Sequence, residues 1–358
     1  MIVIADDITG AAEIAGMASD GTKVIATDTR SLTQEEAVAE TNRIVEKHKL
    51  TKDLQIFKKT DSALRGHIVA ELSVLMQKLG YSKCLLLPQN PSKGRIIRGG
   101  KYYINNVLLH ETSFRHDPEY PANRSDVTEM MHGCHYLSLD SQLKDGINIA
   151  EAACTNDIII QLAKADEDTL LAGAADLFRT ICNKNIVTSN FRDFDIPKPL
   201  LIIWGSTQSK SLATEPVLES LGAVEIPMKS DVFHGEASID SWIETLKNAY
   251  FSSQALIMTI GHEPVGGKDY AVRLREDMAI AAAELCNVLP PHTIIIEGGA
   301  TAFAVLSALG WTQFDMEHEF APGVVALRHE VTDKVASLVE ETIVVLKPGS
   351  YPWGGIFQ

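Results

Sequence analysis

The chain has 358 residues and a composition typical of a folded globular protein, with 45% hydrophobic and 22% charged residues. That balance argues against a disordered chain, and the length indicates two domains of ordinary size. The formal charge of −15 disfavours nonspecific attraction to nucleic acid or to an anionic membrane surface, so we expect neither as a partner.

The cysteines and the start of the sequence indicate where the protein works. Five cysteines are present, an odd number, and no two form a C-x-x-C pair. This pattern is typical of a reducing compartment, so we expect a cytoplasmic location. Met1 leads directly into an apolar run without the basic segment of a signal peptide. The most membrane-like stretch, 293–311, is interrupted by Glu297 and two glycines, so no bilayer-spanning helix is expected.

Short apolar, largely β-branched runs recur along the chain and predict buried strands. They are Ile2–Ala5, Lys23–Thr27, Leu54–Phe57, Cys84–Leu87, Ile158–Leu162, Leu201–Trp204, Ala255–Ile260, Thr293–Ile296 and Thr342–Leu346. Helix-length segments lie between many of them; one places Ile68, Leu72 and Leu75 at helical spacing and stops before Gly80. This alternation predicts an α/β fold of mainly parallel sheets flanked by helices.

A break in the pattern indicates the domain boundary. The segment 190–199 is polar and contains two prolines directly before the strand expected at Leu200. We therefore predict domains of 1–198 and 199–358. Because ligands of parallel α/β sheets bind beyond the carboxyl ends of the strands, the residues after each strand are the candidates for function.

The first candidate motif is Ala5-Asp6-Asp7-Ile8-Thr9-Gly10, which joins a strand to a helix of small residues. An aspartate at this edge could accept a hydroxyl proton, orient the hydroxyl, or hold Mg²⁺. The structural alternative is an N-cap for the helix, but a cap needs only one of the two carboxylates. We interpret both as catalytic candidates and place Asp7 before Asp6.

The second motif, Lys58-Lys59-Thr60-Asp61-Ser62-Ala63-Leu64-Arg65-Gly66-His67, also follows a strand and precedes a helix. Arg65 could bind a substrate carboxylate through two hydrogen bonds, and Lys59 could lie near a transferred phosphate. Asp61 and Ser62 could bond sugar hydroxyls. The alternative is a solvated turn capped by Asp61 or Ser62.

The third feature is a basic stretch in an acidic chain. Between Leu72 and His110 there is no Asp or Glu, although six basic residues are present. They are Lys78, Lys83, Lys93, Arg95, Arg98 and Lys101. This stretch predicts a local site that attracts an anionic substrate. The alternative is that the basic side chains pair with acids elsewhere in the fold.

The fourth feature is a set of glycine turns in the second half, each after an expected strand. They begin at Gly205, Gly261 and Gly298. A helix that begins at Ala300 would direct its free amides toward a phosphate, so these turns predict a nucleotide cradle. The alternative is that the glycines only shape tight turns. Neither a P-loop nor, after the first strand, the G-x-G-x-x-G fingerprint occurs.

These motifs in combination resemble the four-carbon acid sugar kinases, which phosphorylate threonate, erythronate or their 2-oxo forms. The strongest pieces are Ala5–Ala11, Lys59–His67 and the stretch from Pro88 to Pro118. The resemblance implies an amino-terminal domain for the sugar acid, a carboxy-terminal domain for ATP, and an active site in the cleft between them. The sugar-side residues that it implies are Asp6, Asp7, Lys59, Asp61, Ser62, Arg65, Gly66 and Arg95. The implied ATP-side residues are Ser206, Gly298, Gly299, Ala300, Thr301 and Gly349.

The second half departs from the family pattern. Gly205-Ser-Thr-Gln208 stands where the family usually has Gly-Ser-Cys-Ser, and Ala300 stands where an acid is common. We expect a kinase that uses ATP and Mg²⁺, without assigning protein ligands to the metal. Two alternatives remain, a noncatalytic sugar-acid or nucleotide-binding protein, and an oxidoreductase, which the missing dinucleotide fingerprint disfavours. The oligomeric state is open, a homodimer included.

Overall fold

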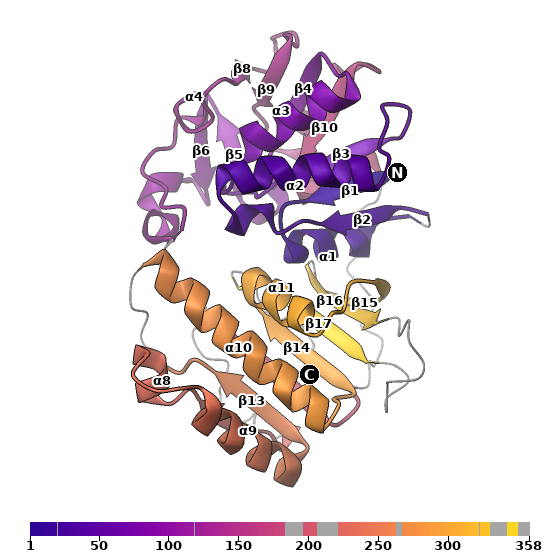
Figure 1. Cartoon of the computed structure of the whole chain (residues 1–358). Coiled ribbons are helices and arrows are strands. Elements are labelled where there is room, and N and C mark those ends of the chain that lie inside the picture. Colours follow the sequence, from indigo (N-terminus) through magenta and orange to yellow (C-terminus); the bar gives the residue numbers. More distant parts are fainter. Residues whose placement is uncertain are drawn as a thin grey trace. The chain divides into compact units, whose positions relative to one another are not determined.

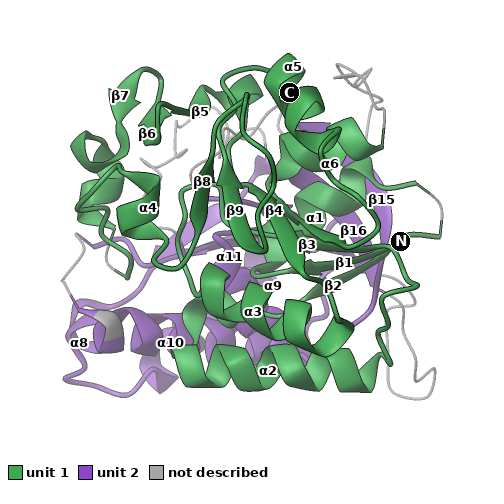
Figure 2. Ribbon diagram, turned by 90° about the horizontal axis from the view of Figure 1, so that it is seen from above, with its two compact units in different colours: residues 1–187 green, residues 188–358 purple. Residues whose placement is uncertain are grey.

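The computed structural model describes residues 1–19, 21–117, 119–182, 196–205, 221–262, 267–321, 323–329 and 342–349. The chain separates into two compact units, residues 1–187 and 188–358 (Figure 2). The sequence placed the boundary between Lys198 and Pro199. Because residues 183–195 lie outside the described part, that boundary stays a prediction.

Unit 1 is built on a seven-stranded sheet in which all paired strands run parallel. In spatial order its strands are β2 (Lys23–Ala26), β1 (Ile2–Ala5), β3 (Ile56–Lys59), β10 (Thr169–Gly173), β4 (Lys83–Leu87), β9 (Gly146–Ala150) and β8 (His135–Leu137). A small antiparallel sheet follows β4 in the chain. It contains β5 (Arg95–Arg98), β6 (Lys101–Ile104) and β7 (Val107–Leu108).

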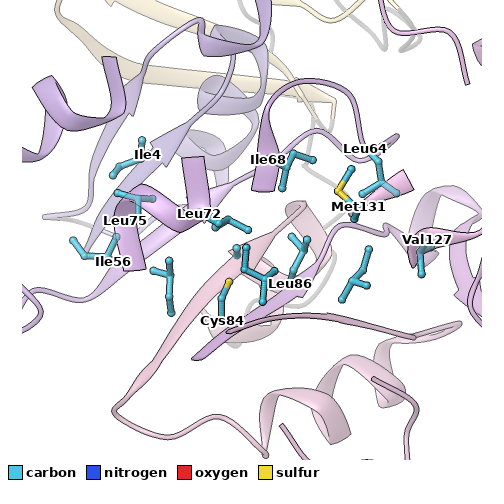
Figure 3. Packing of buried hydrophobic residues seen from close by; sticks show 14 of the residues in the cluster. Ile4, Ile56, Leu64, Ile68, Leu72, Leu75, Cys84, Leu86, Val127 and Met131 are labelled. Atoms are coloured by element: carbon cyan, nitrogen blue, oxygen red, sulfur yellow. The ribbon is translucent and has the colours of Figure 1, made fainter. Parts of the chain in front are cut away.

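Helices cover both faces of the unit 1 sheet because successive side chains of a strand point to opposite faces. The helices are α1 (Ile8–Met17), α2 (Gln34–Lys47), α3 (Ile68–Leu79), α4 (Val127–Met130), α5 (Thr155–Leu162) and α6 (Ala175–Ile181). Ile4 of β1 packs with Leu72 and Leu75 of α3 on one face (Figure 3). Its neighbour Val3 packs on the other face with the apolar residues of α1, α5 and α6.

Unit 2 contains a second seven-stranded sheet, whose order is β12-β13-β11-β14-β17-β16-β15. Figure 1 labels five of these strands, β13 to β17. The parallel strands are β12 (Val224–Pro227), β13 (Ala255–Thr259), β11 (Leu200–Trp204), β14 (Thr293–Glu297) and β17 (Ile343–Lys347). β16 (Val324–His329) and β15 (Phe314–Ala321) add an antiparallel edge. The described helices are α8 (Ser230–His234), α9 (Asp240–Ser253), α10 (Lys268–Val288) and α11 (Gly299–Ala308). α9 packs on β12 and β13, and α11 packs on β14 and β17.

The predicted α/β class, with mainly parallel sheets flanked by helices, is confirmed. The predicted helix that stops at Gly80 is also confirmed, because α3 ends at Leu79 and Gly80 caps it in the left-handed conformation. No helix in the described part of the chain is long and apolar enough to cross a membrane.

One predicted strand, Ile158–Leu162, is wrong, because these residues form the end of helix α5. Ile158 is buried, whereas Ile159 and Ile160 are exposed, so a run of three isoleucines does not mark a buried strand here. Asp157 accepts hydrogen bonds from the backbone amides of Ala153 and Cys154 and caps the helix. The capping hydrogen bonds of Asp157 favour a helix here, although the three isoleucines favour a strand.

Candidate active site

The carboxyl ends of five neighbouring strands in unit 1 lie in register. The pairing aligns Ala26, Ala5, Lys59, Gly173 and Leu87, which are the last residues of β2, β1, β3, β10 and β4. The residues that follow these strands therefore emerge along one edge of the sheet. This is the edge where ligands of parallel α/β sheets bind.

Asp6 and Asp7 follow β1, and their environments differ sharply. Asp7 caps α1: its Oδ1 accepts from the Gly10 amide at 2.9 Å, and its Oδ2 accepts from the Thr9 hydroxyl at 2.5 Å. Asp6 is 2% exposed, yet neither of its carboxylate oxygens has a hydrogen-bond partner among the described residues. The cap predicted as the structural alternative therefore involves Asp7 alone.

The pKa values of Asp6 and Asp7 differ because the two carboxylates have different neighbours. Burial and the neighbouring charge of Asp7 raise the pKa of Asp6 to about 6, although Arg30 and two lysines oppose the shift. For Asp7, burial acts upward, but the charges of Arg30 and Lys59 and the hydrogen bond from Thr9 hold its pKa below the ordinary value. Asp7 is therefore ionised at neutral pH, whereas Asp6 titrates close to it.

Arg30, which sequence reasoning missed, links the two predicted motifs. It lies in the 3₁₀ turn Thr29–Ser31 after β2. Its guanidinium donates to Asp7 Oδ2 at 2.9 Å and to Asp61 Oδ2 at 3.1 Å. The two anions raise the pKa of Arg30 against the opposing effect of burial. No motif surrounds this arginine in the sequence, and only its place after a predicted strand could have drawn attention to it.

Arg65 is already held by two carboxylates. It donates to Asp61 through Nε and Nη2, at 3.1 and 2.7 Å, and to Asp117 through Nη1 at 3.1 Å. Asp61 also accepts from the Ala63 amide at 2.8 Å. Burial would raise the pKa of Asp61, but the charges of Arg65 and Arg30 hold it far below its usual range. Gly66 follows with φ of 88° and packs beside Arg30.

The two lysines of the second motif face different surroundings. Lys58 is fully buried and pairs with Glu71 of α3 at 2.7 Å. Lys59 lies at the strand end, where its ammonium donates to the Thr60 carbonyl at 3.1 Å and lies 3.9 Å from Glu13. Lys93, in the basic stretch, pairs with the same Glu13 at 2.7 Å. Among the described residues, the Lys59 ammonium at the sheet edge therefore has only this one long ion pair.

Arg95 of the basic stretch reaches the second motif. Its side chain is 9% exposed and donates to the Ser62 hydroxyl. The guanidinium also lies 5.5 Å from the ring centroid of Phe114. The Tyr102 hydroxyl, from the next strand, donates to the Ser62 carbonyl. The structure thus brings Arg95 of the basic stretch into contact with Ser62 of the second motif. This contact places a cation of the basic stretch beside the second motif, where the sequence predicted an anion site.

Some of the buried polar atoms that lack partners among the described residues lie at or after these strand ends in unit 1. Besides both oxygens of Asp6, the Thr60 hydroxyl after β3 and the Asn90 side-chain amide nitrogen after β4 lack partners in the structure. Buried polar groups are rarely left without hydrogen bonds, and such exceptions indicate a missing water, ion or ligand. A polyhydroxylated ligand offers the donors and acceptors that these atoms lack.

In unit 2 the aligned strand ends are Pro227, Thr259, Trp204, Glu297 and Lys347. Two of the predicted ATP-side turns meet there. A Cβ added at Gly205, after β11, would lie 2.1 Å from the Thr301 hydroxyl of α11, so only glycine permits this contact. Gly298 precedes α11 with φ of 98°, which also favours glycine.

Of the other predicted ATP-side residues, the structure describes all but Ser206. α11 begins at Gly299, so its first turn contains Ala300 and Thr301, as predicted within one residue. Gly349 lies beyond β17, and its carbonyl accepts from Lys347 at 3.4 Å. Lys347 is buried and also lies 3.4 Å from Glu297. Ser206 lies outside the described residues.

Comparison with known proteins identifies relatives along nearly the whole chain. A family model described as a sugar-binding N-terminal domain matches residues 1–187. A 3-oxo-tetronate kinase of Brucella melitensis is 30% identical, over 90% of this chain and 88% of that protein. A D-erythronate kinase of Heliobacterium modesticaldum is 25% identical, over 98% of this chain and 88% of that protein.

Solved structures share the fold. The crystal structure of a Haemophilus influenzae protein covers 100% of this chain and 98% of that chain, with a TM-score of 0.66 and 18% sequence identity. At that identity the likeness supports the fold alone. The family model and the related kinases agree with the resemblance found in the sequence motifs. The chain belongs to the four-carbon acid sugar kinase family.

Proposed function

We propose that this protein transfers the γ-phosphate of ATP to a hydroxyl of a small sugar acid, such as threonate, erythronate or an oxo-tetronate. Unit 1 binds the sugar acid, and unit 2 binds the nucleotide. Kinase activity of this family is supported by the named relatives, and the dependence on ATP and the four-carbon substrate are our proposal. Transfer requires the two ligands to meet when both are bound.

The observation that carries the proposal is the buried carboxylate of Asp6. It has no hydrogen-bond partner in the part of the chain that the structure describes, and its pKa of about 6 places it near the pH at which a general base works best. A carboxylate buried in this state costs stability, so a functional role is the simplest reason for it. Asp7, placed first from the sequence, has its oxygens engaged by Gly10, Thr9 and Arg30. We therefore assign proton acceptance to Asp6 and orientation to Asp7.

The proposed step is a displacement at the γ-phosphorus. The substrate hydroxyl oxygen forms a bond to phosphorus, the bond to the β–γ bridging oxygen breaks, and ADP leaves. The hydroxyl proton passes to Asp6. Lys59, whose only carboxylate neighbour within ion-pair distance is 3.9 Å away in the described structure, offsets charge on the transferred group.

In unit 2, backbone amides rather than side chains are the groups suited to bind the phosphates of ATP. The first amides of α11 and the close approach of Gly205 and Thr301 form a turn without side-chain bulk, as phosphate binding requires. ATP would bind with Mg²⁺, which would neutralise charge on its phosphates. No group of three or more candidate metal ligands occurs in the described part of the chain, and Mg²⁺ commonly binds through substrate phosphates and one or two carboxylates.

The test is ADP release by purified protein with Mg²⁺ and ATP, screened against D- and L-threonate, D-erythronate, their oxo forms and glycerate. We expect acid-dependent ADP release with at least one of them. Binding of an acid without any ADP release would instead favour a noncatalytic sugar-acid-binding protein. Activity with neutral sugars alone would contradict the acid specificity.

A further inference from the structure

We infer that Arg95 is the residue that selects a carboxylated substrate, and that Arg65, the arginine expected to do so from the sequence, is part of the scaffold of the site. This inference rests on the proposed function, because it assigns the carboxylate contact within the same site. It concerns binding alone and can be tested without ATP.

Arg95 differs from the other buried cations in its partners. Four cationic side chains of the described residues are classed as buried: Lys58, Lys59, Arg95 and Lys347. The three lysines each have a carboxylate within 4.0 Å, supplied by Glu71, Glu13 and Glu297 respectively. No described carboxylate lies within that distance of Arg95, whose observed side-chain partner is the neutral Ser62 hydroxyl.

The neighbouring arginines show the opposite arrangement. Arg30 binds Asp7 and Asp61, and Arg65 binds Asp61 and Asp117. The charge of Arg95 lowers the pKa of Asp61, but the hydrogen bonds to both Asp61 oxygens come from Arg30 and Arg65. A substrate carboxylate at Arg65 would have to displace an internal ion pair, whereas at Arg95 it would supply the missing counter-ion.

The surroundings of Arg95 suit a planar anion. A guanidinium can bind a carboxylate through two parallel hydrogen bonds, and such contacts are strongest where water is excluded. The Phe114 ring, 5.5 Å from the guanidinium, provides an apolar neighbour. The Ser62 hydroxyl accepts from Arg95 and therefore lies directly beside the guanidinium. Cation and hydroxyl groups thus occur together, as recognition of a hydroxylated acid requires.

The experiment measures binding by calorimetry in the absence of nucleotide. The ligands are D-threonate and D-erythronate, each compared with its neutral alditol, threitol or erythritol. Wild type should bind an acid and prefer it to the alditol. In Arg95→Gln the affinity for the acid should fall by about 100-fold, the size expected for a charge-assisted contact, and the preference should disappear. Arg95→Lys should recover part of it.

The matched control is Arg43→Gln, because Arg43 lies in unit 1 on α2, outside the basic stretch, and is exposed. Its acid affinity should equal that of wild type. Folding provides a second readout: Arg95→Gln should change the melting temperature little, since no carboxylate loses its partner. Arg65→Gln should lower it, because Asp61 and Asp117 would lose a buried counter-ion. Equal melting temperatures for these two variants would contradict the scaffold role of Arg65.

The outcomes separate this inference from the proposed function. If wild type phosphorylates an acid and Arg95→Gln binds that acid normally, the inference is wrong and the kinase assignment stands. If Arg95→Gln keeps acid binding but raises the KM for ATP, Arg95 contacts a phosphate, which also overturns the carboxylate assignment. If acid binding depends on Arg95 but no ADP forms, the inference stands and the kinase proposal fails.

Discussion

The carboxyl ends of the two seven-stranded sheets differ in chemistry. In unit 1 they lead into charged side chains, among them Asp6, Lys59 and Asp61, whereas in unit 2 they lead into glycine turns at Gly205 and Gly298. Charged side chains select a ligand by its own charges, and bare backbone amides accept a phosphate whatever it is attached to. In our proposal, unit 1 therefore determines which substrate is used, and unit 2 supplies the common phosphate donor. Substitutions that remove a charge should weaken function at the sugar-acid site of unit 1. Substitutions that add bulk should weaken nucleotide binding by unit 2.

The largest expected effect is on turnover. Asp6→Asn should lower kcat by about 10³-fold with little change in the affinity for ATP, because general-base catalysis contributes roughly 10² to 10⁴-fold. Asp7→Asn is the matched comparison, since asparagine also caps a helix and the loss should be smaller. Steady-state kinetics of both variants decide the roles. Normal turnover by Asp6→Asn, together with an inactive Asp7→Asn, would return the base to Asp7.

The same substitution should stabilise the protein. The pKa of Asp6 is about 6 in the folded state against an ordinary value of 3.8, so the charged carboxylate destabilises the fold above pH 6. Below pH 3.8 the group is protonated in both states, and its effect disappears. Asp6→Asn should therefore raise the free energy of unfolding by up to about 3 kcal/mol at pH 7.5, and by little near pH 4. Urea denaturation at the two pH values measures this, and a destabilised variant at pH 7.5 would refute it.

Added bulk in unit 2 should weaken the nucleotide alone. In Gly205→Ala the new methyl group would overlap the Thr301 side chain, and overpacking of this kind costs about 1 to 3 kcal/mol. The KM for ATP should rise by about 10-fold, while sugar-acid binding without nucleotide stays unchanged. Ser307→Ala, an exposed change on the same helix, is the control. A shift in acid affinity rather than in KM for ATP would break the division between the two sites.

A last change should appear in the pH profile. The charged groups around Asp6 are Asp7, Arg30, Lys58 and Lys59, and together with burial they set its pKa near 6. Because the proposed base must be ionised, kcat/KM should fall about tenfold per pH unit below pH 6 and level off above it. In Asp6→Asn this dependence should vanish. A profile that stays flat from pH 5 to pH 8 in wild type would argue against Asp6 as the base.

The sequence predicted those features that are local in the chain. The helix that stops at Gly80 and the grouping of Asp6 with Lys59 at one sheet edge follow from short patterns and from parallel topology. The predicted strand Leu54–Phe57 is shifted, because β3 runs from Ile56 to Lys59 and contains both lysines of the second motif. Ile158–Leu162 failed because the same apolar run fits a capped helix. Strands β8, β9, β10 and β12, the small sheet of β5 to β7 and the antiparallel edge of unit 2 were not predicted.

The partners of each charge could not be predicted, because they depend on contacts between distant segments. Arg30 reaches Asp61, and Arg95 reaches Ser62, across 31 and 33 positions of sequence. A motif therefore shows which groups approach the site, but not which of them are already neutralised. That difference separates Arg65 from Arg95, and Asp7 from Asp6.

The central claim is that phosphate moves from ATP to a sugar-acid hydroxyl. Its most direct test uses ATP labelled with ¹⁸O in the γ-phosphate and follows the acid product by mass spectrometry in wild type and in Asp6→Asn. We predict that wild type forms one phosphorylated acid carrying the label for each ADP released, and that Asp6→Asn forms it far more slowly. ADP release without labelled acid, or labelling of neutral alditols alone, would contradict the account.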